Sequence, residues 1–365
     1  MSSNTVRPGG PLTGRAVRDP LVAVESPAPR QRWREILAAS DRALPEHDPA
    51  WTDAMCATDR YRDASRHYLF DDGTDVVLPL VARRGLTGIG GWAASYPPAW
   101  GIGGPVGPTL PVGHARSILR DLRGLRYQRV SIRPDPLDGA VWAEAAREEN
   151  VLAIPRRAHV LDLSQGVDAV WAGLTQSGRR NVRLARRAGV DVKVGCGGEL
   201  LEEYYRLFLT SVDRWAGNQH EPLALARARA ARRDPLTKLQ AMGERLGDEF
   251  RVILAYLDGA PVAGAIVLYG RTGHGTRAAM DRQRMGKSRA GEFVYWTAIE
   301  LACALGCQTF HMGESGWSPA LAQAKEKFGA TPHDYPELRI ERLPWTEADT
   351  AVRRGVKRLI GFTDE

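Results

Sequence analysis

The feature that most constrains the fold of this chain is an order of predicted elements that occurs in both halves. Alternating hydrophobic residues predict a hairpin of strands at 66–70 and 76–81 in the first half, and another at 251–256 and 262–269 in the second. A helical pattern precedes each hairpin, and strands and helices alternate after it. Such alternation is typical of mixed α/β folds. The repeat predicts a duplication, with two copies of one α/β fold in tandem.

The length of 365 residues agrees with two domains, because single domains typically have about 100–200 residues. Residues 1–28 are rich in Pro, Gly, Arg and Ser without periodicity, and they predict a flexible leader. We place the first domain at 29–165 and the second, which carries the main site, at 166–345. Residues 346–365 predict a basic amphipathic helix at the C-terminal end.

Composition excludes several classes of protein. Hydrophobic residues make up 43% of the chain, and ten tryptophans can fill large cores, so a disordered chain is excluded. No stretch reaches the roughly 18 apolar residues of a membrane span, and the first residues lack the apolar region of a signal peptide. Four scattered cysteines neither make a disulfide framework nor complete a zinc site. We expect a cytoplasmic protein without membrane insertion and without a metal.

The excess of positive charge is concentrated in two predicted helices. The formal net charge is +7, and most of it lies in the second half. Arg179, Arg183 and Arg186 share one helical face, and Arg180 lies beside it. Arginine matches phosphate oxygens well, so this helix predicts a phosphate-binding strip; a solvated helix face is the alternative. Four more cations predict either a plain surface helix or a weak RNA contact: Arg353, Arg354, Lys357 and Arg358.

The segment from 309 to 330 carries most of the candidate chemistry. A strand enters a polar, glycine-rich turn and then a helix, which is where open α/β sheets place their ligands. Lys325 lies on this helix and points either to the cleft or to solvent. Glu314 and Asp281 each follow a predicted strand, so both are candidates for holding or deprotonating an amine. Exposed loop carboxylates are the alternative.

Four segments of the chain form a recognisable pattern. They are Trp-x-x-Leu followed by Arg-Arg-Asn-Val-Arg at 171–189, Glu-Tyr-x-x-Leu-Phe-x-x-Ser-x-x-Arg-Trp at 203–215, Gly-x-Pro-Val-Ala-Gly at 259–264 and Lys-x-x-Phe-Gly-Ala at 325–330. Together they resemble the Fem family of aminoacyl-tRNA-dependent aminoacyltransferases, within the GNAT acyltransferase superfamily. The resemblance covers about 165–340 well and the first half only in layout. It implies two tandem GNAT-like domains.

The resemblance implies transfer of an amino acid from aminoacyl-tRNA to an amine of a peptidoglycan precursor, a small peptide or an antibiotic-type small molecule, with no cofactor. Lys325 stands at the position of the family's catalytic lysine, although Ala324 replaces the preceding aromatic residue. We expect Glu314 and Asp281 to act with Lys325 in catalysis. The expected contacts to substrate or phosphate are Arg179, Arg180, Arg183, Arg214, Tyr204 and Ser315.

Two other functions fit parts of the sequence. The turn Gln-Arg-Met-Gly-Lys-Ser at 283–288 is similar to the acetyltransferase turn whose backbone N–H groups hold the pyrophosphate of coenzyme A. Acyl transfer from acetyl-CoA to an amine is therefore the first alternative, although Ser288 stands where Gly or Ala is usual. The second is an RNA-binding protein on a degenerate acyltransferase fold, which predicts binding without turnover.

Overall fold

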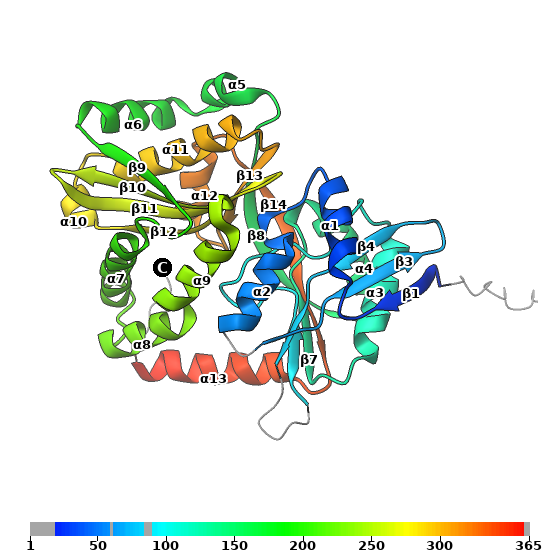
Figure 1. Ribbon diagram of the computed structural model, residues 1–365. Helices are drawn as coiled ribbons and strands as arrows, with labels where there is room; N and C mark the ends of the chain where they lie inside the picture. The colour runs from blue at the N-terminus through cyan, green and yellow to red at the C-terminus, as the bar shows by residue number, and fades with distance from the viewer. Residues whose placement is uncertain (1–18, 59–60, 84–89, 361–365) are drawn as a thin grey trace, which may run out of the picture.

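The computed structural model describes residues 19–58, 61–83 and 90–360. The centre of the described chain is one mixed β-sheet of eleven strands, with helices on both faces (Figure 1). Its strands are β2 (Arg62–Asp63), β5 (Val81–Arg83), β6 (Trp92–Ala94), β7 (Arg129–Ile132), β8 (Leu152–Asp162), β9 (Asp191–Cys196), β10 (Phe250–Leu257), β11 (Ala260–Tyr269), β12 (Gly273–Met280), β13 (Thr309–Glu314) and β14 (Thr331–Glu341).

The strand order in this sheet is β2-β5-β6-β7-β14-β8-β13-β12-β11-β10-β9. The arrangement is the same in both directions from the middle strands β14 and β8. On each side a parallel pair comes first, β7 with β6 or β13 with β12, and antiparallel strands follow. Helices α3 (Val112–Gly124) and α11 (Ala290–Ala304) form the crossovers of the parallel pairs. The predicted mixed α/β class, with two tandem copies of one fold, is confirmed.

Each half of the chain gives one central strand to the sheet of the other half. β8 pairs antiparallel with β13, and β14 pairs antiparallel with β7. β8 and β14 also pair with each other, from Val160 opposite Thr331 to Leu152 opposite Arg339. The two halves thus share one continuous sheet. The division of the chain near residue 165 stays a prediction.

In the first half, α3 and α4 (Gly139–Glu148) cover the sheet because their apolar faces are buried. A second sheet of β1 (Leu21–Glu25), β3 (Arg66–Phe70) and β4 (Asp75–Leu78) joins the same core. α1 (Arg30–Ala39) packs against β4. The expected leader, 1–28, therefore includes a strand, because Leu21 and Val24 pack on this core. Residues 1–18 lie outside the described part of the chain.

In the second half, α6 (Gln176–Arg187) and α11 cover one face of the sheet, while α7 (Leu201–Asn218) and α9 (Leu236–Leu246) cover the other (Figure 1). The halves meet where α2 (Pro49–Thr58) packs against α9. At the same boundary the short 3₁₀ helix η1 (Pro45–His47) carries Glu46, whose buried carboxylate pairs with His274 of β12.

One expected element differs from the structure. The strand expected at 76–81 is divided at Pro79 into β4 and β5, because proline has no N–H for a strand ladder. Outside the predicted hairpins, β8 is a single long strand, and the stretch 217–247 forms α8 (Leu223–Arg233) and α9, whose apolar residues pack on α7.

The C-terminal amphipathic helix expected at 346–365 is α13 (Trp345–Ile360), within the described residues. It runs along the lower edge of the molecule in Figure 1, from the region of β7 to α8. None of the described helices combines the length and the apolar character needed to cross a bilayer.

Candidate functional site

The parallel strands β12 and β13 diverge, and a pocket opens between them. The two strands pair at Gly273 with Phe310 and at His274 with His311, close to where each strand begins. Beyond these pairs a pocket of about 160 Å³ lies between them, closed by α11 and by α12 (Pro319–Glu326). We call it the Lys325 pocket. Its polar lining consists of Thr276, Arg277, Tyr295, Glu314 and Lys325.

Lys325 lies in the last turn of α12, with only 6% of its surface exposed. The Ser318 hydroxyl caps the start of this helix. The Lys325 ammonium donates a hydrogen bond to the carbonyl oxygen of Gly313 at 2.7 Å. Burial lowers the pKa of Lys325 to about 8, while the charge of Glu314 opposes that shift. At neutral pH the group is therefore a cation that gives up a proton readily.

Glu314 lines the same pocket from the end of β13. Its carboxylate accepts a hydrogen bond from the Tyr335 hydroxyl at 2.5 Å and lies 3.3 Å from the Arg133 guanidinium. Burial, together with Glu314, raises the pKa of Tyr335, so the phenol keeps its proton and donates it. Glu314 and Lys325 thus meet in one pocket, while their catalytic roles stay predictions.

Asp281 is not among the residues that line the Lys325 pocket. It caps the short helix α10 (Arg282–Met285), where its carboxylate accepts from the N–H groups of Gln283 and Arg284. Its place in the structure is therefore that of a helix cap, because those hydrogen bonds hold the carboxylate at the turn.

Ser315 follows Glu314 in the turn after β13 and is buried. Its N–H donates to the carbonyl oxygen of Arg157 at 3.0 Å, and its hydroxyl has no hydrogen-bond partner among the described residues. The backbone bond therefore anchors the turn to β8. The predicted contact of Ser315 with substrate stays a prediction.

Helix α7 carries two residues expected to contact substrate, Tyr204 and Arg214, and both take part in packing or hydrogen bonding within the fold. Tyr204 is fully buried among the apolar residues between α7 and the sheet, and burial raises its pKa. Arg214 donates to the carbonyl oxygen of Met280 at 2.6 Å, and Ser211 bonds the same residue. Tyr204 thus belongs to the core, and Arg214 fixes the end of β12 just before Asp281.

The arginine-rich helix α6 is partly used for structure. The Arg179 guanidinium donates to two carbonyl oxygens at the end of α5 (Gly166–Gly173), at 2.6 and 2.7 Å, where helix carbonyls lack helical partners. Arg179 thus caps the end of α5, and its expected phosphate contact stays a prediction. Arg183 lies over the Trp171 ring at 5.6 Å, and Arg180 is exposed.

A larger groove lies between α8, α13 and the first half of the chain, with a volume of about 980 Å³. The rings of Tyr61 and Trp92 line it in edge contact, with centroids 5.4 Å apart. Glu221 is the one carboxylate in the described lining, and it pairs with Arg229 at 2.6 Å. We call this the basic groove, after its cations Arg83, Arg229, Arg232, Arg233, Arg353 and Lys357.

The basic groove separates the four cations predicted on the C-terminal helix into two pairs. Arg353 and Lys357 are four residues apart, so both face the groove, and Val352 and Val356 line it beside them. The other two, Arg354 and Arg358, are exposed and are not part of the lining.

A row of charges connects the basic groove with the Lys325 pocket. Arg277 lines the pocket, and its guanidinium donates to the Asp234 carboxylate at 2.7 Å. Asp234 also pairs with Arg233 of the groove at 2.9 Å and with Lys238 at 3.2 Å. Burial disfavours the charge of Asp234, but these cations hold its pKa well below the usual range. The pocket and the groove are therefore neighbours across one ion-pair row.

Sequence reasoning missed Arg133, Arg277 and Tyr335. Arg277 is a charge within a strand of small and apolar residues, and Arg133 directly follows a buried strand. Charged residues are rarely buried unless they are paired, so an arginine at each of these positions could have predicted an ion pair inside the protein. Tyr335 carried no such signal, because the sequence pattern did not identify the first half of β14.

The comparisons with known proteins agree with this geometry. Residues 175–320 match the family model described as an acetyltransferase (GNAT) domain. The matched segment includes β12 and β13, which diverge around the pocket, and the start of α12. This part of the chain is thus similar to GNAT-type acetyltransferase domains. No curated protein sequence matches the chain.

Two solved structures of low sequence identity share the fold over most of this chain. The structure described as FemX has a TM-score of 0.66 and 11% identity, over 87% of this chain and 97% of FemX. A conserved protein of unknown function from Bacteroides thetaiotaomicron VPI-5482 has a TM-score of 0.53 and 9% identity, over 85% of this chain and 96% of that one. The resemblance to the Fem family is confirmed for the fold.

The Asp234 ion pairs predict a large loss of stability for Asp234→Asn. The substitution leaves the buried Arg277 and Lys238 without their carboxylate, and breaking such a buried pair typically costs about 3–5 kcal/mol. Asp213→Asn is the matched control, because it breaks the exposed pair with Arg227, which we expect to contribute no more than about 1 kcal/mol. Urea unfolding measures both variants. Similar losses in the two would contradict the role of Asp234.

Proposed function

We propose that this protein transfers an aminoacyl group from aminoacyl-tRNA to an amine of a small-molecule or peptide acceptor, and so forms an amide bond. The observation that supports this most is the buried Lys325 ammonium, which a backbone carbonyl holds beside Glu314 in a small pocket. A cation fixed in this way can stabilise negative charge that develops on a reacting oxygen. The proposal includes a cytoplasmic location and an acceptor of the antibiotic or cell-wall-precursor type.

The residues of the pocket suit aminolysis of an ester. The neutral amine of the acceptor attacks the ester carbonyl, and the carbon–nitrogen bond forms as the carbon–oxygen bond to the ribose breaks. We assign Lys325 to the oxygen that becomes negative, and Glu314 to the proton that leaves the amine. That proton is finally returned to the ribose oxygen of the tRNA. Because an aminoacyl ester is already activated, the step needs no further cofactor.

The sizes of the two cavities suit a large anionic donor with a small reacting end. Sites for whole small molecules typically measure about 300–1,000 Å³, so the Lys325 pocket of about 160 Å³ suits an aminoacyl group. The basic groove of about 980 Å³ combines cations with two aromatic rings, which is the chemistry that binds single-stranded nucleic acid. We therefore assign the groove to the acceptor end of the tRNA.

Acetyl-CoA is the alternative donor, and the turn at 283–288 is the place to hold its pyrophosphate. Two features there favour that donor: neighbouring cations, and the buried Ser288 hydroxyl, which has no partner among the described residues. The N–H groups of Gly286 and Ser288, however, already donate to carbonyl oxygens of the same turn at 3.2 and 3.0 Å. Coenzyme A would compete with these bonds, so the tRNA donor is preferred.

One assay separates the donors. The protein is incubated with a panel of amines and peptides, together with either a pool of radiolabelled aminoacyl-tRNAs or labelled acetyl-CoA, with and without RNase pretreatment. We expect label in an RNase-resistant amide from the tRNA donor only, and loss of that product when RNase acts first. Product from acetyl-CoA that RNase does not affect would overturn the proposal. Binding of tRNA without any product would instead support an RNA-binding protein.

Lys325→Met tests the proposed oxyanion contact. We expect kcat to fall by about 10²–10³ with a smaller change in KM, as for removal of an oxyanion donor. Because the ammonium is the active form, the wild-type rate should decrease as the pH rises through the pKa of about 8. Lys325→Arg keeps a cation to much higher pH, so the decrease of the rate should begin at a higher pH in that variant. An unchanged kcat in Lys325→Met would remove this residue from the mechanism.

The basic groove makes a separate prediction about tRNA binding. The double variant Arg232→Ala with Arg353→Ala should weaken binding and reduce the salt dependence, by about one unit of slope for each phosphate that the variant no longer neutralises. The matched control is Arg354→Ala with Arg358→Ala, which removes the same charge from outside the groove. Filter binding at several salt concentrations measures both. Equal effects of the two double variants would show that only net charge matters.

A further inference from the structure

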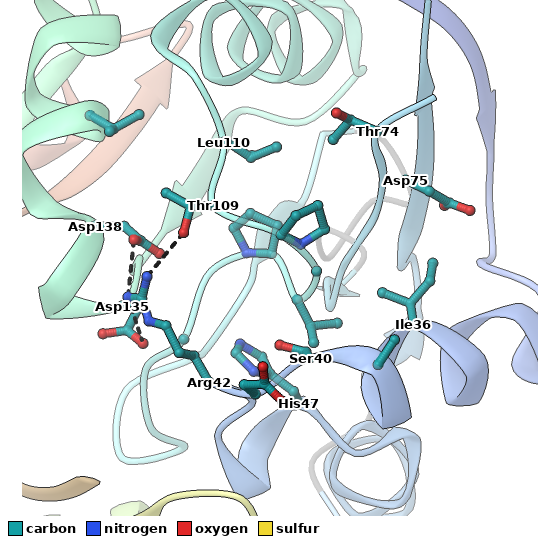
Figure 2. A pocket seen from close by; sticks show the side chains of 18 of the residues that line it. Ile36, Ser40, Arg42, His47, Thr74, Asp75, Thr109, Leu110, Asp135 and Asp138 are labelled. Atoms are coloured by element: carbon teal, nitrogen blue, oxygen red, sulfur yellow. Dashed lines mark hydrogen bonds and ion pairs between the residues drawn. The ribbon is translucent and has the colours of Figure 1, made fainter. Parts of the chain in front are cut away.

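A second pocket, of about 540 Å³, lies in the first half of the chain (Figure 2). It stands between the loop 103–110, the start of α4, the end of α1 and the turn before β4. Gly103 pairs in parallel with Pro134 just beyond β6 and β7. The pocket therefore lies beyond the end of the parallel pair of the first half.

The chemistry of this pocket is opposite to that of the basic groove. Two guanidinium groups, of Arg32 and Arg42, line it together with five carboxylates, so the lining is acidic in a protein of net charge +7. Apolar side chains such as Ile36, Val106 and Leu110 make up part of the remaining wall. The carboxylates are Glu35, Asp41, Asp75, Asp135 and Asp138.

Two of these carboxylates share a single cation. The Arg42 guanidinium donates to Asp138 at 3.1 Å and lies 3.9 Å from Asp135, and it also donates to the Thr109 hydroxyl at 3.2 Å (Figure 2). Burial raises the pKa of both carboxyl groups, and the neighbouring charge of Asp135 adds to the effect at Asp138. The pair therefore has less positive charge around it than two carboxylates need, and an entering ammonium would supply it.

His47 lines the pocket as a buried, neutral ring. Its Nδ1 atom accepts a hydrogen bond from the Leu44 N–H at 3.0 Å, and burial lowers the pKa of the ring, so the neutral tautomer carries its proton on Nε2. The backbone of Gly103 and Gly104 interacts with the ring and opposes this shift. The ring therefore adds no positive charge against the carboxylates of the pocket.

We propose that this pocket is a second ligand site, for a small hydroxylated amine that carries more than one ammonium group, such as an amino sugar. The ammonium groups would bind Asp135, Asp138 and the exposed Asp41 at the rim, where the two guanidinium groups leave the carboxylates in excess. Apolar wall residues suit the carbon faces of such a ring. The site goes beyond the transfer reaction and does not depend on it.

The test uses two disaccharides of the same skeleton. The β-1,4-linked disaccharide of glucosamine carries two ammonium groups, and N,N′-diacetylchitobiose carries none. In titration calorimetry without tRNA, we expect saturable binding of the first, weakened by salt, and no binding of the second. Equal binding of both, or no saturable binding of the charged disaccharide, would overturn the proposal. Because no transfer is measured, either result leaves the reaction at Lys325 unaffected.

Variants locate the binding within the pocket. Asp138→Asn and Asp41→Asn should each lower the affinity for the charged disaccharide by about tenfold or more, as expected for loss of a charged hydrogen bond. Glu144→Gln, on the outer side of α4, is the matched control and should bind like the wild type. If Asp138→Asn does not fold, the exposed Asp41 still decides the question. Unchanged affinity in Asp41→Asn and in any folded Asp138→Asn would place the ligand elsewhere and refute the site.

Discussion

The pairing of β8 with β14 is the constraint on which the rest of the structure depends. These two strands form the middle of the sheet, and each also pairs with a strand of the opposite half. Because of this exchange, Tyr335 of β14 and Arg133 at the end of β7 both reach Glu314 at the end of β13. A carboxylate in the second half is thus oriented by the first half. The candidate active site is a product of the whole chain.

The two buried cations near the site are held by different kinds of partner. Lys325 has a neutral carbonyl oxygen as its hydrogen-bond acceptor, and burial lowers its pKa although the charge of Glu314 opposes that shift. Arg277 forms an ion pair with the Asp234 carboxylate, which also pairs with other cations. The first arrangement leaves a cation able to respond to a reacting group, and the second makes a rigid wall between pocket and groove. The chain therefore places a weakly compensated cation and a cation with a carboxylate partner on the same pocket.

Much of the fold could be predicted because it depends on local patterns. Helical and strand periodicities identified most elements of both halves, and Lys325 and Glu314 share a pocket because a single turn and one helix connect them. The cap that Arg179 makes could not be predicted, since its partners are carbonyl oxygens at the end of another helix. The pairs Arg133 with Glu314 and Arg277 with Asp234 join residues far apart in sequence, and no local pattern indicates such partners.

The exchanged strands also affect how the chain is made. β8 has both of its neighbours, β13 and β14, in the second half, and β14 ends at Glu341 of a 365-residue chain. During translation the first half therefore emerges with both edges of β8 unpaired, until β13 and β14 of the second half follow. Unpaired strand edges are templates for association with other chains. A nascent chain of this design therefore exposes β8 to such association for as long as the second half is missing.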